Sequence, residues 1–223
     1  MVLKNYSNLI QEFIRSGYRD IFFNELSSSN NQLIIRHDID FNCEFAFKMA
    51  KIEKEIGVKS SYFFMVNNPI YNIFSEKNKK YIQEISKMGH QISIHYDCDS
   101  GDLEKEINLF QSFFDIKIRI ISIHRPNLEY LGNIKYEHTY LKKYFKQIKY
   151  ISDSRGEFRF GHPFETEEFK KLKSIQLLIH PVWWVSDKNT VIETIKDMIK
   201  KNNQLNKLFF KENSIPYQKY LKS

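Results

Sequence analysis

Short apolar runs of β type alternate with amphipathic helical patterns along this chain, and that alternation limits the possible folds more than any other feature. Most of these runs are continuous stretches of apolar residues, which is typical of strands that are buried on both faces. The runs are Leu33–Ile35, Tyr62–Val66, Ile92–His95, Ile118–Ile123, Tyr150–Ser152 and Ile175–Ile179. Alternating strands and helices predict a parallel sheet, either open and doubly wound or closed into a barrel.

The segments between the runs have the spacing of helices. Residues 45–56 place apolar side chains at steps of 4, 3 and 4, and Gly57 follows as a common helix stop. Residues 103–114 repeat these steps, and residues 77–88 and 191–199 also have a helical pattern. Because no repeat, low-complexity block or linker interrupts the 223 residues, we expect one domain over residues 1–223.

Composition and charge exclude several classes of protein. The chain is 42% hydrophobic and 27% charged, as in an ordinary globular protein. Its net charge of +7 comes largely from residues 196–222, which contain seven lysines and only two acidic residues, Asp197 and Glu212. These lysines follow a helical pattern without an arginine cluster or a known binding motif, so we expect a solvated face and no nucleic-acid partner.

The sequence also lacks the features of a membrane-spanning or exported chain. No apolar run approaches the ~18 residues that a transmembrane helix needs. The first residues do not combine a basic region with an apolar stretch, so we expect no signal peptide and a cytoplasmic location. Cys43 and Cys98 are then expected to be reduced thiols. Nothing in the pattern indicates an oligomeric state.

Ionisable residues gather where the first predicted strand ends. Leu33–Ile35 is followed directly by Arg36-His37-Asp38-Ile39-Asp40. Such groups are costly to bury unless they are paired or bound to a metal. Asp38 and Asp40 leave the same face of an extended chain, so together they can hold a cation, or one can hold it while the other accepts a proton. They can equally be solvated acids at the start of the next helix.

Three further strands each end in a histidine: His95, His124 and His180. A single histidine at a strand end is more often structural than functional. In a parallel sheet, however, the carboxyl ends of the strands meet at one edge, where active sites form. Three histidines and an aspartate pair at that edge suit a metal held by imidazole and carboxylate ligands, with one position open to water.

Five segments match, in order, the motifs of a known family. The sequence resembles the polysaccharide deacetylases with a NodB homology domain, of the carbohydrate esterase family 4 type, in the branch whose first motif reads Arg-His-Asp-Val-Asp. The matching segments are Arg36–Asp40, Gly89–His95, His124–Pro126, the neighbourhood of Asp153, and Leu178–Pro181. The resemblance implies a distorted (β/α) barrel of about seven parallel strands. It also implies hydrolysis of an N-acyl amide, such as an acetamide, on an amino sugar or glycan precursor.

The resemblance also implies the catalytic roles. Asp38 would be the general base, and Arg125 would pair with it to keep it ionised. His180 would be the general acid that protonates the leaving amine, and Asp153 would orient its ring.

The expected cofactor is one divalent metal ion, with zinc favoured, bound by Asp40 and His95. The family's second metal-binding histidine follows the first by four positions, and here Asp99 stands there. The third ligand is therefore open between His124, Asp97 and Asp99, with His124 preferred. If none of them serves, the chain is a catalytically inactive relative that binds a glycan or a partner through the same cleft.

Overall fold

The computed structural model describes residues 5–99, 101–126, 131–159 and 161–222. At its centre is a sheet of seven parallel strands in the order β5-β4-β3-β2-β7-β6, with β1 paired to β2. The strands are β1 (Arg19–Asp20), β2 (Gln32–Ile39), β3 (Ser61–Phe64), β4 (Gln91–Asp97), β5 (Ser122–His124), β6 (Lys149–Ser152) and β7 (Ile175–Ile179). Within the described residues, the edge strands β5 and β6 do not pair with each other. The sheet is thus an open, distorted (β/α) barrel, which confirms the predicted fold class.

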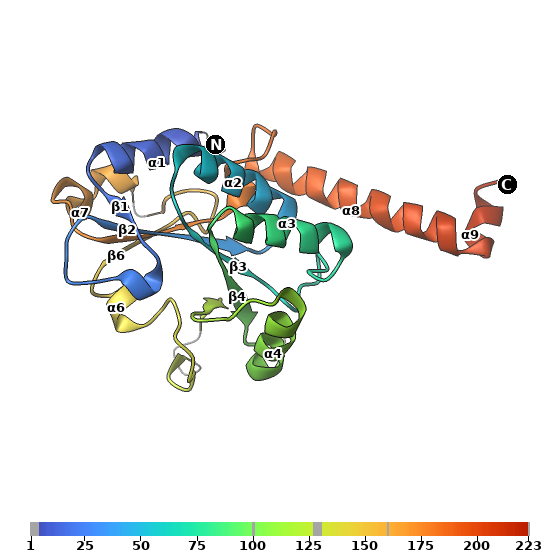
Figure 1. Cartoon of the computed structure of the whole chain (residues 1–223). Coiled ribbons are helices and arrows are strands. Elements are labelled where there is room, and N and C mark those ends of the chain that lie inside the picture. The colour runs from blue at the N-terminus through green and yellow to red at the C-terminus, as the bar shows by residue number, and fades with distance from the viewer. Residues whose placement is uncertain (1–4, 100, 127–130, 160, 223) are drawn as a thin grey trace.

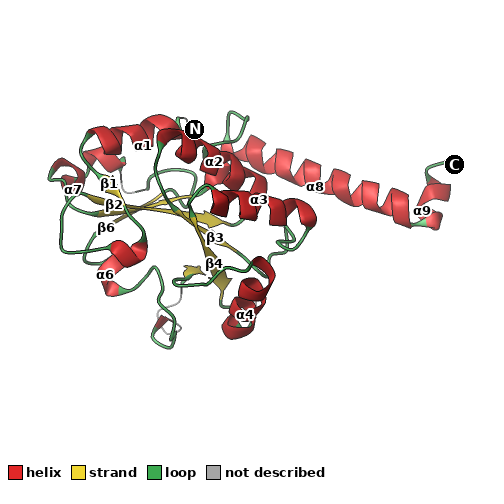
Figure 2. Ribbon diagram, viewed as in Figure 1, coloured by secondary structure: helices red, strands yellow, loops and turns green. Residues whose placement is uncertain are grey.

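Helices connect the strands, and Figures 1 and 2 show α1, α2 and α3 along one face of the sheet. The longer helices are α1 (Tyr6–Arg15), α2 (Cys43–Ile56), α3 (Glu76–Lys87), α4 (Leu103–Phe114) and α8 (Val191–Asn213). The shorter ones are η1 (Phe23–Glu25), α6 (Lys142–Phe145), η2 (Pro163–Glu165), α7 (Glu167–Lys170), η3 (Pro181–Trp183) and α9 (Ile215–Tyr220). None of the helices in the described ranges combines the length and apolarity of a bilayer span.

The alternation of side chains along β2 separates two environments. Leu33, Ile35 and Ile39 face the helices and belong to the main core. Ile34 points to the other side, where it packs with Phe63 and three further residues in a small cluster. Because the side-chain period of a strand is two, Arg36 and Asp38 lie on the same side as Ile34. The small cluster therefore forms an apolar floor one pleat before the ionisable residues.

Three elements illustrate how the structure differs from the expectation drawn from the sequence. The strand expected at Ile118–Ile123 is Ser122–His124 in the structure, and the two-residue strand β1 had no recognisable apolar run. The helix expected from residue 191 continues to Asn213, and Thr190 caps its start by accepting a hydrogen bond from the backbone N–H of Glu193. The glutamate side chain bonds back to the cap, and these reciprocal bonds fix the start of the helix.

A buried carboxylate links β2 to the helical layer. Glu53 of α2 is fully buried and accepts hydrogen bonds from the hydroxyls of Tyr6, Ser60 and Tyr62. Its Oε1 also lies 2.8 Å from Nε2 of His37, whose Nδ1 is 3.1 Å from the carbonyl oxygen of Ile179. His37 therefore faces away from Asp38, and its ring ties β2 to β7 immediately before the residues at the ends of these strands.

We expect Glu53→Gln to lower the free energy of unfolding by about 3–5 kcal/mol, because it removes a buried charge that several donors face. The glutamine side chain would also bring N–H donors into a space where the neighbouring hydroxyls and imidazole already act as donors. Chemical denaturation measures the loss. Glu55→Gln, on the exposed side of the same helix, is the matched control and should change stability by less than about 0.5 kcal/mol. Equal stability of the two variants would show that the network contributes nothing.

The same carboxylate predicts an acid limit to stability. Burial alone would raise the pKa of Glu53, but His37, His90 and the Ser60 hydroxyl lower it to about 2. A depressed pKa gives stability that is complete above the unfolded-state pKa of about 4.5 and is lost as the pH falls towards 2. Unfolding measured between these limits should therefore depend less steeply on pH in Glu53→Gln than in the parent.

Candidate active site

The end of β2 delivers three charged side chains to one face of the sheet. Arg36 and Asp38 are buried and form a bidentate ion pair, with Nε to Oδ1 at 2.9 Å and Nη2 to Oδ2 at 2.7 Å. Asp40 is the next residue on that face and is 15% exposed. Residues i, i+2 and i+4 of a strand share a face, so the local sequence itself brings the three together.

Arg36 is surrounded by groups that replace its water. Its Nη2 donates to Ser122 Oγ at 2.5 Å, and its Nη1 donates to Gln176 Oε1 at 3.3 Å. The ring of Tyr140 lies 5.1 Å from the guanidinium carbon, a cation–π distance. Burial alone would raise the pKa of Asp38, but Arg36, with help from His95 and His180, holds it well below its usual range. Asp38 is therefore a permanent anion at neutral pH.

The guanidinium beside Asp38 thus belongs to Arg36 and not, as the resemblance implied, to Arg125. Arg125 is exposed, and its backbone adopts φ 45°, in the left-handed region, directly after β5. Burial raises the pKa of Asp97, and the contact with His124 lowers it. The charge of Arg125 adds a smaller lowering effect. The exposed Arg125, in the turn after β5, is therefore not the partner of Asp38.

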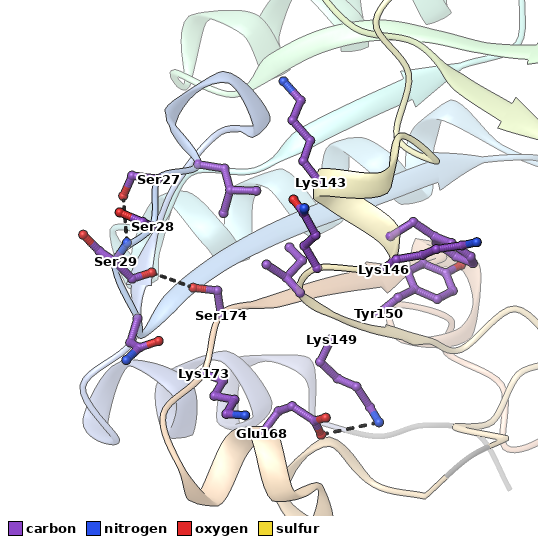
Figure 3. Close-up of a pocket in the computed structure, with 15 residues that line it drawn as sticks. Ser27, Ser28, Ser29, Lys143, Lys146, Lys149, Tyr150, Glu168, Lys173 and Ser174 are labelled. Atoms are coloured by element: carbon purple, nitrogen blue, oxygen red, sulfur yellow. Dashed lines mark hydrogen bonds and ion pairs between the residues drawn. The ribbon is translucent and has the colours of Figure 1, made fainter. Parts of the chain in front are cut away.

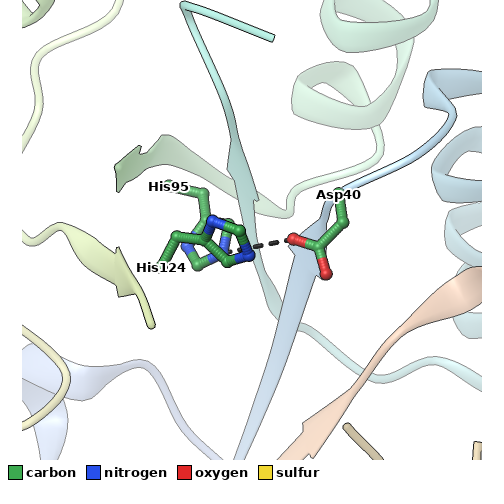
Figure 4. A group of neighbouring side chains, drawn as sticks. All are labelled: Asp40, His95 and His124. Carbon is green, nitrogen blue, oxygen red and sulfur yellow. Dashed lines mark ion pairs between the residues drawn. The ribbon is translucent and has the colours of Figure 1, made fainter. Parts of the chain in front are cut away.

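Asp40, His95 and His124 lie together at the ends of β2, β4 and β5 (Figure 4). Each residue offers one possible ligand atom, a ring nitrogen or a carboxylate oxygen. These three atoms all lie within 4.8 Å of one another. The Nε2 of His95 is 3.2 Å from Asp40 Oδ1. The structure therefore brings together the three residues that the sequence proposed as metal ligands.

Hydrogen bonding around His95 leaves its Nε2 facing Asp40. Ser122 has one proton, and when it donates that proton to Asp38 Oδ1 at 3.1 Å, its oxygen accepts from Arg36 and from Nδ1–H of His95 at 2.9 Å. In that arrangement a neutral His95 presents the lone pair of Nε2 to Asp40 Oδ1, which is buried and lies 3.2 Å away. A lone pair facing an anionic oxygen favours a cation between the two atoms, whereas a doubly protonated ring pairs with Asp40 directly.

His124 is oriented by a carboxylate in the same way that metal-binding histidines usually are. Its Nδ1 lies 3.2 Å from Asp97 Oδ2, which leaves Nε2 available to a ligand. Asp97 is therefore a hydrogen-bonding partner of His124. Asp99 is exposed, and its backbone N–H donates to Asp97 Oδ1. Of the three candidates for the third ligand, the geometry favours His124.

A second constellation closes the site from β6 and β7. His180 Nδ1 is 2.6 Å from Asp153 Oδ1, while Nε2 points towards Asp40 Oδ2 at 3.6 Å. Asp153 is fully buried and also accepts from the backbone N–H of His180 and from the indole N–H of Trp184. Burial by itself would lower the pKa of His180, but Asp153, followed by Asp40 and Asp38, raises it to about 9.

The two tryptophans after His180 are part of the wall of the barrel. Trp183 and Trp184 are only 6% and 9% exposed, so neither presents an open ring face on which a sugar could stack. Trp184 instead holds the carboxylate that orients His180. Sequence reasoning had not identified this role, nor that of Ser122, because both contacts join residues far apart in the chain.

Cavities lie at both ends of the sheet. A cavity of about 10 Å³ lies against Asp38 and Asp40, which is about the space of one water molecule. A wider one, of about 650 Å³, lies at the opposite, amino-terminal ends of β6 and β7 (Figure 3). None of the candidate catalytic or metal-binding residues lines it. Lys149 at its edge pairs with Glu168.

Comparison with known proteins finds likeness at the level of structure. No protein-family model matches the sequence, and none of the curated proteins matches it. A chitin deacetylase from the fungus Colletotrichum lindemuthianum aligns with 14% identity over 82% of this chain and 86% of its own, at a TM-score of 0.47. A family 4 carbohydrate esterase from Bacillus anthracis aligns with 15% identity over 90% and 86%, also at 0.47.

A pseudoenzyme of the same esterase family, also from Bacillus anthracis, aligns with 12% identity over 83% of this chain and 68% of its own, at a TM-score of 0.43. The family suggested by the motifs therefore recurs among similar structures, both active and inactive. At this level of identity and TM-score, likeness does not assign an activity, which has to be argued from the side chains.

We expect Ser122→Ala to weaken divalent-metal binding by about 10–100-fold, because His95 loses the acceptor that fixes its tautomer. Titration of the metal-free protein with Zn²⁺ measures the change. Ser152→Ala is the matched control, since this serine also stands at a strand end but bonds to Ser154 and Tyr150 and to none of the candidate ligands. Unchanged affinity in Ser122→Ala would mean that the hydroxyl does not set the state of His95.

Proposed function

We propose that this protein is a metal-dependent hydrolase that removes an N-acyl group, acetyl in the simplest case, from an amino sugar. The observation that carries the proposal is that three kinds of functional side chain lie close together. Asp38 Oδ2 and His95 Nε2 are 3.7 Å apart, and His180 Nε2 is 3.6 Å from Asp40 Oδ2. A permanent anion, a set of metal ligands and an oriented imidazole thus all face the same point. The sugar part of the proposal rests on the motif resemblance.

Asp40, His95 and His124 would hold the ion. Two imidazoles and one carboxylate suit Zn²⁺, with a further position left to water or substrate. When bound, the ion supplies Lewis acidity, which lowers the pKa of water towards ~7 and polarises an acyl carbonyl. Hydroxide is scarce at neutral pH, so this is the contribution that amide hydrolysis needs first.

Asp38 is the group placed to accept the proton of the attacking water. Its bidentate pairing with Arg36 fixes both oxygens and keeps the carboxylate ionised. A carboxylate held so firmly in its anionic form is a weak base, so it can work only on a water that is already acidified. The same pairing leaves Asp38 Oδ2 close to His95, at the edge of the ligand set.

His180 is placed to give a proton to the departing amine, which otherwise leaves poorly. Asp153 binds Nδ1, so Nε2 is the nitrogen turned towards the reaction space. The carboxylate also stabilises the imidazolium, and Trp184 and the backbone N–H of His180 hold that carboxylate in place. Base and acid are supplied by different strands, β2 and the end of β7, on two sides of the ligand set.

An inactive, glycan-binding relative is the alternative, and the aspartate at position 99 was its main support. The grouping of His124 with Asp40 and His95 weakens that support, because a complete set of three ligands exists without Asp99. The orienting partners behind His95, His124 and His180 are also present. A site that only bound a glycan would have no need of them.

Metal content tests the ligand set. We expect the purified protein to bind one divalent ion per chain and the Asp40→Ala/His95→Ala double variant to bind none, because only one of three ligands then remains. Asp99→Ala is the control and should retain the ion. Elemental analysis after dialysis gives the numbers, and a double variant with full metal content would place the ion elsewhere.

Turnover tests the base. On an N-acetylated amino sugar, Asp38→Asn should lower kcat by roughly 10²–10⁴-fold with little change in KM, because a general base acts only in the transition state. The ligands Asp40 and His95 are untouched, so metal content should stay at one per chain. Full activity in this variant would assign the base to another residue.

His180→Gln provides the second arm, because Asp38→Asn also leaves buried Arg36 without its anion and can lose stability. The glutamine variant leaves the ion pair intact and should lose kcat by a similar factor, less for substrates with better leaving groups. Unfolding curves of all variants serve as the folding control. A parent protein that binds metal but hydrolyses no acylated amino sugar would support the inactive alternative.

A further inference from the structure

The last 24 described residues, 199–222, form an extension that we name the C-terminal arm. It consists of the distal part of α8 and of α9, and Figure 1 shows it projecting away from the barrel. The first turns of α8 are anchored, since Thr194 is buried and Val191, Ile195 and Met198 pack against the core. From residue 199 on, no described side chain belongs to the core.

The arm is unusually rich in exposed apolar side chains. Eight large ones are at least half exposed, with Tyr220 at 71%, Ile215 at 66% and Leu205 at 64%. The others are Ile199, Leu208, Phe209, Phe210 and Leu221. In the rest of the described chain only Leu109 and Ile192 are exposed to that extent. Apolar groups gathered in this way mark a surface that something covers.

An apolar stripe and a lysine stripe occupy opposite sides of α8. Met198, Leu205 and Phe209 step by 7 and 4 residues, which keeps them on one face of a helix. Lys200, Lys207 and Lys211 repeat those steps two residues later, about 200° around the helix axis. These two stripes make α8 amphipathic, while Lys201, Leu208 and Glu212 lie between them.

Charge decides which partner suits this face. The arm holds six lysines and one acidic residue, Glu212, a net charge of +5. If two copies of the chain paired through their arms, two strongly positive surfaces, each with a single carboxylate, would face and repel each other. An anionic surface complements the arm along its whole length. A basic helix with leucine and phenylalanine on its other face is the pattern of helices that lie in the plane of a membrane interface.

We propose that the C-terminal arm docks the protein on an anionic lipid surface, with Leu205, Phe209 and Phe210 entering the headgroup region and the lysines meeting the lipid charges. Asn202 and Asn206 interrupt the apolar face, which limits it to shallow insertion. The barrel stays outside the lipid because the arm projects from it (Figure 1). This attachment is independent of the hydrolysis proposed for the strand ends.

Co-sedimentation of the full chain with vesicles tests the proposal. Vesicles of phosphatidylcholine and phosphatidylserine, at a ratio of roughly two to one, should bind it, and pure phosphatidylcholine should bind it far more weakly. Binding should fall as salt is raised, because the surface charges are screened. Absence of binding to the anionic vesicles, or equal binding to both kinds at all salt concentrations, would overturn the proposal.

Two variants assign the binding to the arm. Lys200→Gln/Lys207→Gln/Lys211→Gln should weaken it roughly 100-fold, from about five-fold per lysine. Phe209→Ser/Phe210→Ser should also abolish stable sedimentation, because the apolar contribution is lost. Lys54→Gln/Lys59→Gln/Lys80→Gln and Leu109→Ser, at exposed positions outside the arm, are the matched controls and should bind like the parent. Turnover of a soluble substrate should be unchanged in all four.

Two other outcomes would assign the arm to a different partner. A dimer in light scattering that Phe209→Ser/Phe210→Ser converts to a monomer, without lipid binding by the parent, would mean that a second copy covers this face. Salt-sensitive binding of a nucleic-acid oligonucleotide, without vesicle binding, would mean that the lysines serve a nucleic acid. Either result would overturn the lipid proposal.

Discussion

The buried pair of Arg36 and Asp38 is the interaction on which the site depends. Removing two charges from water is costly, and the pair persists only because Ser122, Gln176 and the ring of Tyr140 replace the lost hydration of the guanidinium. Ser122 in turn bonds to both members of the pair and to Nδ1 of His95. The ion pair on β2 and the imidazole on β4 therefore belong to one hydrogen-bond network, which turns Nε2 of His95 towards Asp40.

Much of this was visible in the sequence because strands impose simple rules. Continuous apolar runs separated by helical spacing give a parallel sheet, and polar residues just beyond them identify the edge where a site forms. The period of two that places Asp38 and Asp40 on one face also places Arg36 there. The partner of Asp38 could therefore have been found locally, had the motif resemblance not directed attention to Arg125. The two-residue strand β1 carries too little pattern to be recognised.

Contacts across long sequence separations could not be predicted in this way. Ser122 and Asp38 are 84 residues apart, and Trp184 and Asp153 are 31 apart. Periodicity shows which face a side chain leaves, but not which atom it meets on a neighbouring strand, because the stagger between strands is set by packing of the whole sheet. Trp183 and Trp184 directly follow His180 in the sequence, but nothing local indicates that the indole of Trp184 bonds to Asp153, the carboxylate that contacts the ring of His180.

The two faces of β2 explain why so many ionisable groups can be tolerated at one strand end. His37 and Glu53 satisfy each other on the helical side, whereas Arg36, Asp38 and Asp40 occupy the inner side. Among these groups Asp40 Oδ1 stands apart, because it is buried without a hydrogen bond and lies 3.2 Å from Nε2 of His95. In a network of otherwise paired groups, this carboxylate oxygen is the place where a bound cation would contribute most. The hydrogen bonds to Ser122 and Asp97 already fix the rings of His95 and His124, so the proposed ligands would need little rearrangement to hold an ion.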